Sequence, residues 1–522
     1  MRTKSIYLTL MVLLMVFSVA CTPETAGTDN QTASKDDNGS NETSQSRRSD
    51  VVIAMESDAV TMLANTDVNY VNDAQIRNIY DPLIARDEEG KPVIPVLATE
   101  WKNIDELTWE FTLREGVTFH NGEPFNAEAV KYNIDYILDE SNNSYYRSRW
   151  VNVDEVKVID DYKLQITTKK PFPDLITRIT DDLLIMEPGH VEEVGLEEAA
   201  KNPIGTGPYK FDQWERDQYL RLVANEDYWQ GEPSIKEVTF RYIPEFSSRL
   251  TALLSGEVDL IKNVPVDSVA RIENADGVKL ETVQSSRVNY LALNTFYDGP
   301  LKDKKVRQAI NYAIDVDELL QGVLDGFGTK MTGPLSKINE GYTETKDYEF
   351  DPDKAIQLLQ EAGYNPEDLS LQLDTPEGRY PMDSQVAQAI AAQLGSIGIN
   401  VKVQVNEWGN HLTKIQQREM KDMFILGWGP AFDAQSTIEN LFTQEAPYSS
   451  FYDEEVEEMI YNATPIFDPE DRKAAFDEIQ HRLVEEAAWV PLWQQEDLYG
   501  VNEDLNFTPL PDETLQVFDM SW

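Results

Sequence analysis

The chain has 522 residues, of which 41% are hydrophobic and 10% aromatic, so it is long enough for roughly two to four domains with packed cores. Its 93 acidic and 45 basic residues give a formal net charge of −48. So acidic a surface repels phosphate groups and excludes nucleic acid as a partner, and it indicates either an ordinary solvated surface or adaptation to a saline or alkaline habitat.

The N-terminus has the pattern of a signal peptide that ends at a cysteine. Arg2 and Lys4 precede an apolar run at residues 6–20, which is too short to span a bilayer comfortably. Cys21 is the only cysteine of the chain, and the polar stretch that follows it, to residue 49, is typical of a flexible tether. The pattern resembles a bacterial lipoprotein signal, which implies cleavage after residues 1–20 and acylation of the Cys21 thiol. The alternative is ordinary secretion with a free thiol.

The folded part is expected to begin with a buried strand near Asp50. Asn121-Gly122, within a segment of alternating apolar and polar residues, predicts a hairpin. Asn126 is placed to cap a helix over 127–138, and two alternating strands flank Asp160-Asp161. Residues 96–200 are therefore expected to form a small unit of hairpins and helices.

Strands return after this unit, with a short one at 258–261 and a strongly apolar one at 288–294. Beyond them helices and strands alternate, as where the apolar face of the helix at 384–398 precedes a strand at 399–405. A helix near 472–486 and a strand in "AWVPLWQQ" follow. This order predicts an α/β fold (mixed α+β) with a parallel or mixed sheet covered by helices.

The sequence lacks a recognisable catalytic or cofactor motif. Its four histidines have no metal-ligand spacing, so we predict no metal site and no cofactor. "GTGPYK" at 205–210 lacks the third glycine of a phosphate loop and is assigned to a structural turn. Paired carboxylates for glycoside hydrolysis stay open, because 93 acidic residues guarantee chance pairs. A binding protein that is not an enzyme is the leading class.

Six stretches of the folded chain are similar to one family. They are "IYDPLIARDEEGKPVIPVLATEWK", "FTLREGVTFHNGEPFNAEAVKY", "NPIGTGPYKFDQW", "LLSGEVDLI", "YLALNTFYDGPLKDKKVRQAINYAID" and "QLGSIGINVKV". Together they resemble the family 5 extracellular solute-binding proteins of ABC transporters, the group that binds dipeptides, oligopeptides, glutathione and nickel.

The resemblance implies a two-lobed fold of the periplasmic-binding-protein type (class II), with an extra subdomain in lobe one. Lobe one is expected at 51–287 plus 490–522, with its subdomain at about 96–200, and lobe two at 288–489. Two crossings, near "NYLALN" and "WVPLWQQ", are expected to form a hinge, with the ligand between the lobes. Arg307 in "DKKVRQAI" is expected to form a structural ion pair.

The resemblance also implies which residues of lobe two hold a peptide ligand. Arg379, with Tyr380 beside it in "TPEGRYPMD", lies where such proteins bind the ligand carboxylate, and an arginine matches a carboxylate in bidentate geometry. Asp433 in "LGWGPAFDAQ" resembles the aspartate that pairs with a peptide amino terminus. Surface positions are the alternative for both residues.

The remaining candidates are expected to shape the pocket. Gly427 and Gly429 allow close approach to a ligand, and Trp428 can form a wall. Trp408 is a further candidate wall residue, with core packing as the alternative.

In lobe one the loop "ESDAVTMLANTDVNY" matches the family poorly. Thr61 and Tyr70 are the candidates there.

The sequence thus predicts a monomeric lipoprotein on the extracellular face of the cell membrane, anchored by a lipid on Cys21. It captures a small peptide and delivers it to the permease of an ABC importer. Glutathione, an oligosaccharide or a metal chelate are alternative ligands, with nickel least favoured because histidines are few. A surface glycosidase with paired carboxylates is the alternative from another class.

Overall fold

A computed structural model describes residues 48–522 except 67–69, 88–89, 92 and 430–431, and the side chains of 70–72 are not described either. The predicted signal peptide, Cys21 and the tether up to residue 47 lie outside the described residues. In the part that is described, no helix has the length and apolar character needed to cross a membrane. Residues 48–522 form one unit.

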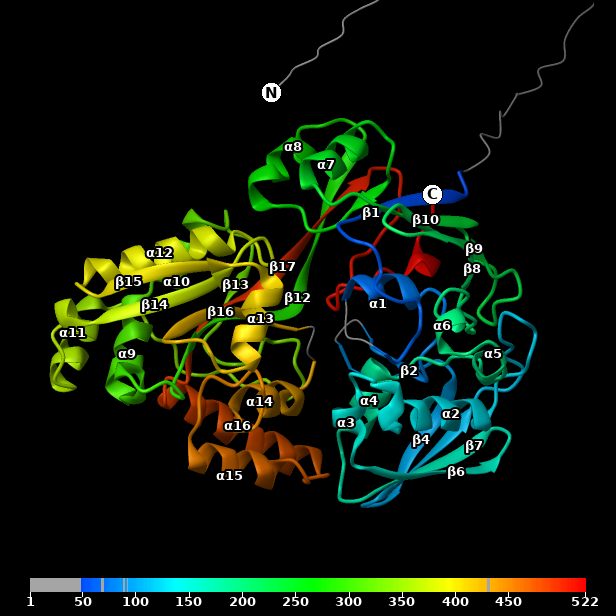
Figure 1. Cartoon of the computed structure of the whole chain (residues 1–522), viewed down its shortest axis with the longest axis horizontal. Helices are drawn as coiled ribbons and strands as arrows, with labels where there is room; N and C mark the ends of the chain where they lie inside the picture. Colours follow the sequence, from blue (N-terminus) through cyan, green and yellow to red (C-terminus); the bar gives the residue numbers. More distant parts are fainter. Residues whose placement is uncertain (1–47, 67–69, 88–89, 92, 430–431) are drawn as a thin grey trace, which may run out of the picture. The chain divides into compact units, whose positions relative to one another are not determined.

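One large mixed sheet runs through this unit, which confirms the predicted fold class (Figure 1). In spatial order its strands are β15 (Asn400–Asn406), β14 (Ser370–Pro376), β16 (Met423–Trp428), β12 (Val278–Leu293), β17 (Trp489–Asn502), β11 (Leu260–Ile261), β1 (Asp50–Met55), β10 (Glu237–Tyr242), β9 (Tyr219–Ala224) and β8 (Tyr209–Glu215), with β13 (Thr329–Lys330) also on β17. β14 and β1 are each parallel to both neighbours. The strands between them are antiparallel.

β12 and β17 are the two long strands that join the ends of this sheet (Figure 1). They pair antiparallel, with a register shift between Gln284 and Val288. β12 also pairs with β16, and β17 also pairs with β11. The sequence predicts a strand at both places. Each strand extends beyond its apolar segment, since β12 begins at Val278 and β17 continues to Asn502.

A second sheet of four antiparallel strands belongs to the predicted small unit at 96–200. Its order is β4 (Ala98–Asp105), β5 (Thr108–Leu113), β7 (Lys163–Thr168) and β6 (Val153–Asp160), and β2 (Ile84–Ala85) with β3 (Ile94–Pro95) forms a short ribbon nearby. The hairpin predicted at Asn121-Gly122 is present but short. Thr118 and Pro124 form an antiparallel bridge, flanked by main-chain hydrogen bonds from Phe119 to Glu123 and from Phe125 to Val117.

The helices follow the predicted pattern. They are α1 (Tyr70–Ile76), α2 (Ala127–Leu138), α3 (Arg147–Trp150), α4 (Leu175–Asp182), α5 (Pro188–Val194), α6 (Leu196–Ala199), α7 (Phe246–Leu254), α8 (Val269–Glu273), α9 (Lys304–Ala313), α10 (Val316–Gly322), α11 (Pro352–Glu361), α12 (Asp383–Ser396), α13 (Trp408–Gln416), α14 (Ala434–Phe442), α15 (Glu454–Ala463) and α16 (Pro469–Glu485). Asn126 caps α2 as predicted, because its side chain accepts the N–H of Ala129.

Side chains of β12 and β16 alternate between two hydrophobic cores. Leu291 and Leu293 pack with residues of α9 and α12 on one face of the sheet. Tyr290 and Ala292 pack with residues of α14, α15 and α16 on the other face. Successive side chains of a strand point to opposite faces, so a continuously apolar strand is what a sheet covered on both sides requires.

The "GTGPYK" segment has the structural role that we expect. A Cβ atom on Gly205 would lie 2.2 Å from the carbonyl oxygen of Ile79, and one on Gly207 would lie 2.6 Å from the carbonyl carbon of the same residue. Both glycines therefore allow the segment to pack against the chain that follows α1.

Arg307 on α9 joins that helix to the C-terminal end of α16, as predicted. Its guanidinium donates to the main-chain oxygens of Glu486, Ala487, Leu301 and Lys302, and Nη2 lies 3.4 Å from the Glu486 carboxylate. The last carbonyl groups of a helix have no partner inside the helix, and here a buried cation binds them.

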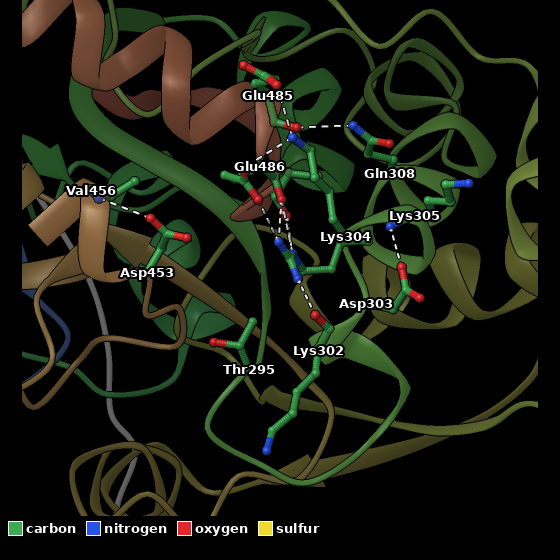
Figure 2. A network of polar contacts seen from close by, with 12 residues as sticks. Thr295, Lys302, Asp303, Lys304, Lys305, Gln308, Asp453, Val456, Glu485 and Glu486 are labelled. Carbon is green, nitrogen blue, oxygen red and sulfur yellow. Dashed lines mark hydrogen bonds and ion pairs between the residues drawn. The ribbon is translucent and has the colours of Figure 1, made fainter. Parts of the chain in front are cut away.

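Neighbouring contacts reinforce this junction (Figure 2). The Lys304 ammonium reaches both Glu485 and Glu486, and the Gln308 amide donates to the main-chain oxygen of Glu485. Asp303 caps α9 by accepting the N–H of Lys305. The start of α9 is therefore fixed at the point where α16 ends.

We expect Arg307→Ala to lower the free energy of unfolding by roughly 2–4 kcal/mol, because several buried carbonyl groups lose a charged donor. Lys305→Ala is the matched control on the same helix, and its half-exposed ion pair with Glu361 should be worth less than about 1 kcal/mol. Urea unfolding followed by tryptophan fluorescence measures both. Equal losses for the two variants would contradict the structural role of Arg307.

Candidate functional site

A cavity of about 1650 Å³ lies within the unit of residues 48–522. The first half of the chain contributes Arg77 and Arg178 to its wall, the second half contributes Arg379 and Asp433, and the C-terminal tail contributes residues between Phe507 and Met520. Its volume exceeds the roughly 300–1,000 Å³ of pockets that enclose drug-sized ligands, so it has room for an extended ligand.

The wall of this cavity is rich in charged side chains. Its eight cations are Arg77, Arg86, Arg149, Arg178, Arg249, Lys262, Arg287 and Arg379. Its ten carboxylic acids are Glu56, Asp73, Asp81, Asp87, Asp181, Asp182, Asp433, Asp512, Glu513 and Asp519. Aromatic residues between them, including Trp408, Trp428 and Tyr448, supply apolar surface. Charges and rings together suit a small ligand that has both ionised and apolar groups.

The loop before α12 is shaped by a single carboxylate. Asp383 accepts the main-chain N–H groups of Gly378, Arg379, Tyr380 and Ser384. These bonds hold the turn at the carboxyl end of β14, where open α/β sheets bind ligands. The Arg379 side chain is thereby held at the cavity.

Arg379 has a guanidinium without an anionic partner in the described part of the chain. Its guanidinium carbon lies 5.2 Å from the ring centre of Tyr380 and 5.3 Å from that of Trp408. Of the eight cations that line the cavity, Arg379 alone has no hydrogen-bond acceptor or ion-pair partner for its side chain among the described residues. Its donors are available to a ligand.

Tyr380, Gly427 and Gly429 also line the cavity. The sequence predicted that the two glycines allow a ligand to approach, and the structure shows protein groups packed closely against both of them. Tyr380 donates its hydroxyl to the Gly427 oxygen at 3.2 Å, and burial raises the pKa of that hydroxyl. A Cβ on Gly427 would lie 2.6 Å from the Tyr380 ring, and one on Gly429 would lie 2.7 Å from the Cα of Arg287. These glycines make room for neighbouring protein groups, where the sequence suggested room for a ligand.

Asp433 is held at the N-terminus of α14. One of its oxygens accepts the N–H of Ser436 at 2.7 Å, and its backbone bridges that of Glu340. No ion pair to Asp433 is found among the described residues, and the residue is the N-cap of α14. Asp433 therefore lines the cavity as a carboxylate with a second oxygen available.

Trp428 and Trp408 are both partly buried at the cavity wall. Trp428 packs against Tyr448, with 5.4 Å between ring centres. Trp408 packs edge-on against Tyr380 and stacks on His411. Trp408 thus combines the two roles that the sequence left open, since it both packs in the core and faces the cavity.

The candidates from the first lobe stand apart from this arrangement. Thr61 accepts the N–H of Leu63 with its hydroxyl and is not among the residues that line the cavity. Tyr70 begins α1, and its side chain lies outside the described residues.

Charged residues of α4 in the first half of the chain also lie at the cavity, and sequence reasoning missed them. Arg178 and Asp174 form a buried ion pair at 2.6 Å. The pKa of Asp174 is raised to about 7, mainly by burial. Arg178 lowers this pKa, and the charge of Asp433 raises it. The charge of Asp433 thus acts on groups of α4.

Arg287 and Glu513 form the other pair that the sequence does not indicate. Arg287 is buried in β12 and donates from Nε (2.9 Å) and Nη2 (2.5 Å) to the same oxygen of Glu513. Lys262 donates to the main-chain oxygen of Glu513 at 2.9 Å. More than 200 residues separate Arg287 from Glu513, and no local pattern predicts such a pair.

The buried histidines are structural. Burial lowers the pKa of His120 and of His411 to about 4, and each ring is bonded to a main-chain oxygen. Within the described ranges no group of three or more His, Cys, Asp or Glu side chains is arranged to hold a metal ion.

Comparison with known proteins links this architecture to a family. Residues 92–449 match the bacterial extracellular solute-binding proteins, family 5. The glutathione-binding protein GsiB of Escherichia coli strain K12 is 28% identical over 483 residues, which cover 89% of this chain and 92% of that protein.

Solved structures show the same fold. The substrate-binding protein CtaP from Listeria monocytogenes superposes with a TM-score of 0.84 at 22% identity, over 91% of this chain and 99% of that one. The binding protein DppA from Helicobacter pylori, in complex with the peptide STSA, gives 0.78 at 26% identity, over 91% of this chain and 98% of that one.

The sheet joined by β12 and β17, the cavity and the family match over residues 92–449 lead to one assignment. The fold is the two-lobed fold of periplasmic binding proteins. The chain belongs to the bacterial extracellular solute-binding proteins, family 5.

Proposed function

We propose that this protein captures a small peptide with free termini in its cavity and passes it to an ABC importer without changing it chemically. Delivery of peptides or related ligands to ABC importers is the task of its family. The lobes are proposed at 51–287 plus 490–522 and at 288–489, with β12 and β17 as the hinge. The protein is proposed to act as a monomer.

The observation that carries the proposal is the unpartnered guanidinium of Arg379. An arginine stays charged at any physiological pH and has five N–H donors in a planar fork. A ligand carboxylate supplies two acceptors in matching geometry. The stacking on Tyr380 and Trp408 holds the fork in place before the ligand binds.

Asp433 supports the second half of the proposal. A peptide ammonium needs an acceptor of opposite charge, and Asp433 lines the same cavity without an ion-pair partner among the residues described. Arg86 and Arg178 are close enough to be affected by the charge of Asp433 but pair with Asp181 and Asp174. The carboxylate of Asp433 is therefore left for the ligand.

Glutathione is the main alternative ligand, because a relative with 28% identity is named for binding it. An oligosaccharide or a metal chelate is less favoured, because an oligosaccharide offers no anion to Arg379. A glycosidase reaction is less favoured. Burial raises the pKa of Asp81, but both of its oxygens already accept hydrogen bonds within the protein, from Thr206, Tyr228 and Trp229, so this carboxyl group is held by its neighbours and not directed at a glycosidic bond.

Arg379→Gln is expected to weaken binding of free-acid tripeptides by about tenfold to a hundredfold, because a charge-assisted pair is worth roughly 1.5–3 kcal/mol. The same variant should change the affinity for C-terminally amidated tripeptides much less. Isothermal titration measures both, and Arg271→Gln on the exposed face of α8 is the control. Equal losses for acid and amide would refute the carboxylate role.

Asp433→Asn is expected to weaken peptides with a free amino group by about tenfold and to leave N-acetylated peptides nearly unaffected. Asparagine is also a good N-cap, so α14 should remain folded. Thermal melting checks the fold, and the ratio of the two affinities tests the role. A ratio that stays at the wild-type value would contradict it.

The lipid anchor on Cys21 is proposed from the sequence pattern, together with a location on the extracellular face of the membrane. Cys21→Ser is expected to move the protein from the membrane fraction to the soluble fraction of the producing cell. Mass spectrometry of the wild-type N-terminus should find a diacylated or triacylated cysteine. An unmodified thiol there would overturn the anchor and leave the binding proposal unaffected.

A further inference from the structure

The cationic end of the cavity is built around Glu513 of the C-terminal tail. Its carboxylate accepts two donors of Arg287, and its main-chain oxygen accepts the ammonium of Lys262. Its backbone has a φ of 64°, in the left-handed region that is unfavourable for a residue with a side chain. The contacts on both sides of the residue hold it in this conformation.

Glu513 is an anion in the wall of the cavity. Burial alone would raise its pKa, yet Arg287, Arg379 and Lys262 hold it below its ordinary value. Both Arg287 donors bind Oε1, and Oε2 has no partner in the part of the chain that the structure describes. Glu513 thus presents a fixed negative charge in the same cavity wall as the guanidinium that we assign to the ligand carboxylate.

Three cations, Lys262, Arg287 and Arg379, lower the pKa of Glu513. Burial, followed by the charge of Glu513, raises the pKa of Asp497 of β17 to about 6, and Asp497 is not part of the cavity wall. Asp383, four residues after Arg379, is bound by four main-chain N–H groups and is not part of the wall either. Glu513 is therefore the carboxylate that these cations hold in the wall of the cavity.

We propose that Glu513 is a specificity-determining residue that restricts the ligand to a single carboxylate at the Arg379 end of the cavity. One ligand carboxylate pairs with Arg379, whose side chain has no acceptor among the described residues. A second carboxylate, as in a peptide with a C-terminal Asp or Glu, meets the negative charge of Glu513 in the same cavity wall, where the repulsion is stronger than in bulk water because protein surrounds both charges. The inference rests on the proposed peptide function and names the subclass of peptide.

The test compares two tripeptides of equal size, Ala-Ala-Gln and Ala-Ala-Glu, by isothermal titration at pH 7.5. The wild type is expected to prefer Ala-Ala-Gln by about tenfold or more. In Glu513→Gln, whose amide oxygen can still accept from Arg287, the preference should fall to within about threefold of one. Glu503→Gln, at an exposed carboxylate of the C-terminal segment that is not part of the cavity wall, is the control and should keep the wild-type preference.

Lys262→Met provides a test in the opposite direction that does not depend on the fold of the Glu513 variant. Removing one cation should increase the preference for Ala-Ala-Gln by a further factor of about five to ten. If both tripeptides bind the wild type equally, or if the preference is unchanged in both Glu513→Gln and Lys262→Met, the inference is overturned while peptide binding stands. If the wild type binds neither tripeptide, the proposed function and this inference both fail.

Discussion

β12 and β17 hold the two ends of the main sheet together because they pair with each other over most of their length and each also pairs with a strand of one end. The second half of β12 pairs with β16, and the C-terminal end of β17 pairs with β11. One of the two register shifts between β12 and β17 falls at 285–287, where three buried polar residues interrupt the apolar pattern. The cavity lies at this point, since Gln284 and Arg287 are part of its wall. The interruption of the apolar pattern of β12 thus places polar side chains at the wall of the cavity.

The charged wall of the cavity depends on that same position. An ion pair in the interior is costly to form unless hydrogen bonds complete it. One such pair joins distant segments, since Arg287 of β12 binds Glu513 of the tail, and another is local, since Arg178 of α4 pairs with Asp174, the residue that precedes α4. These cations already have an anionic partner within the protein. A ligand anion is therefore expected to bind the cation without such a partner among the described residues, Arg379.

Local patterns predicted the elements well because their causes are local. The capping side chain of Asn126, the apolar face of the helix predicted at 384–398 and the alternation in the strand predicted at 399–405 each act within a few residues. The resemblance to a family placed Arg379 and Asp433 on the loops that reach the cavity. The pairing of Arg287 with Glu513 could not be predicted, because more than 200 residues separate the two and no local sequence pattern links them. The lengths of β12 and β17 were missed for a related reason, since pairing extends them beyond their apolar segments.

Three arginines show why burial alone does not mark a functional residue. Arg307 is buried and binds four main-chain oxygens, so its charge serves the junction of α9 and α16. Arg287 is equally buried and binds a carboxylate, so its charge fixes the tail. Arg379 is only partly buried and has ring faces beside it but no acceptor among the described residues. A guanidinium stays protonated in proteins, so Arg379 cannot become neutral when it lacks an acceptor. Water or a ligand anion can supply an acceptor, and an anion that displaces the water stabilises the form of the protein that encloses it.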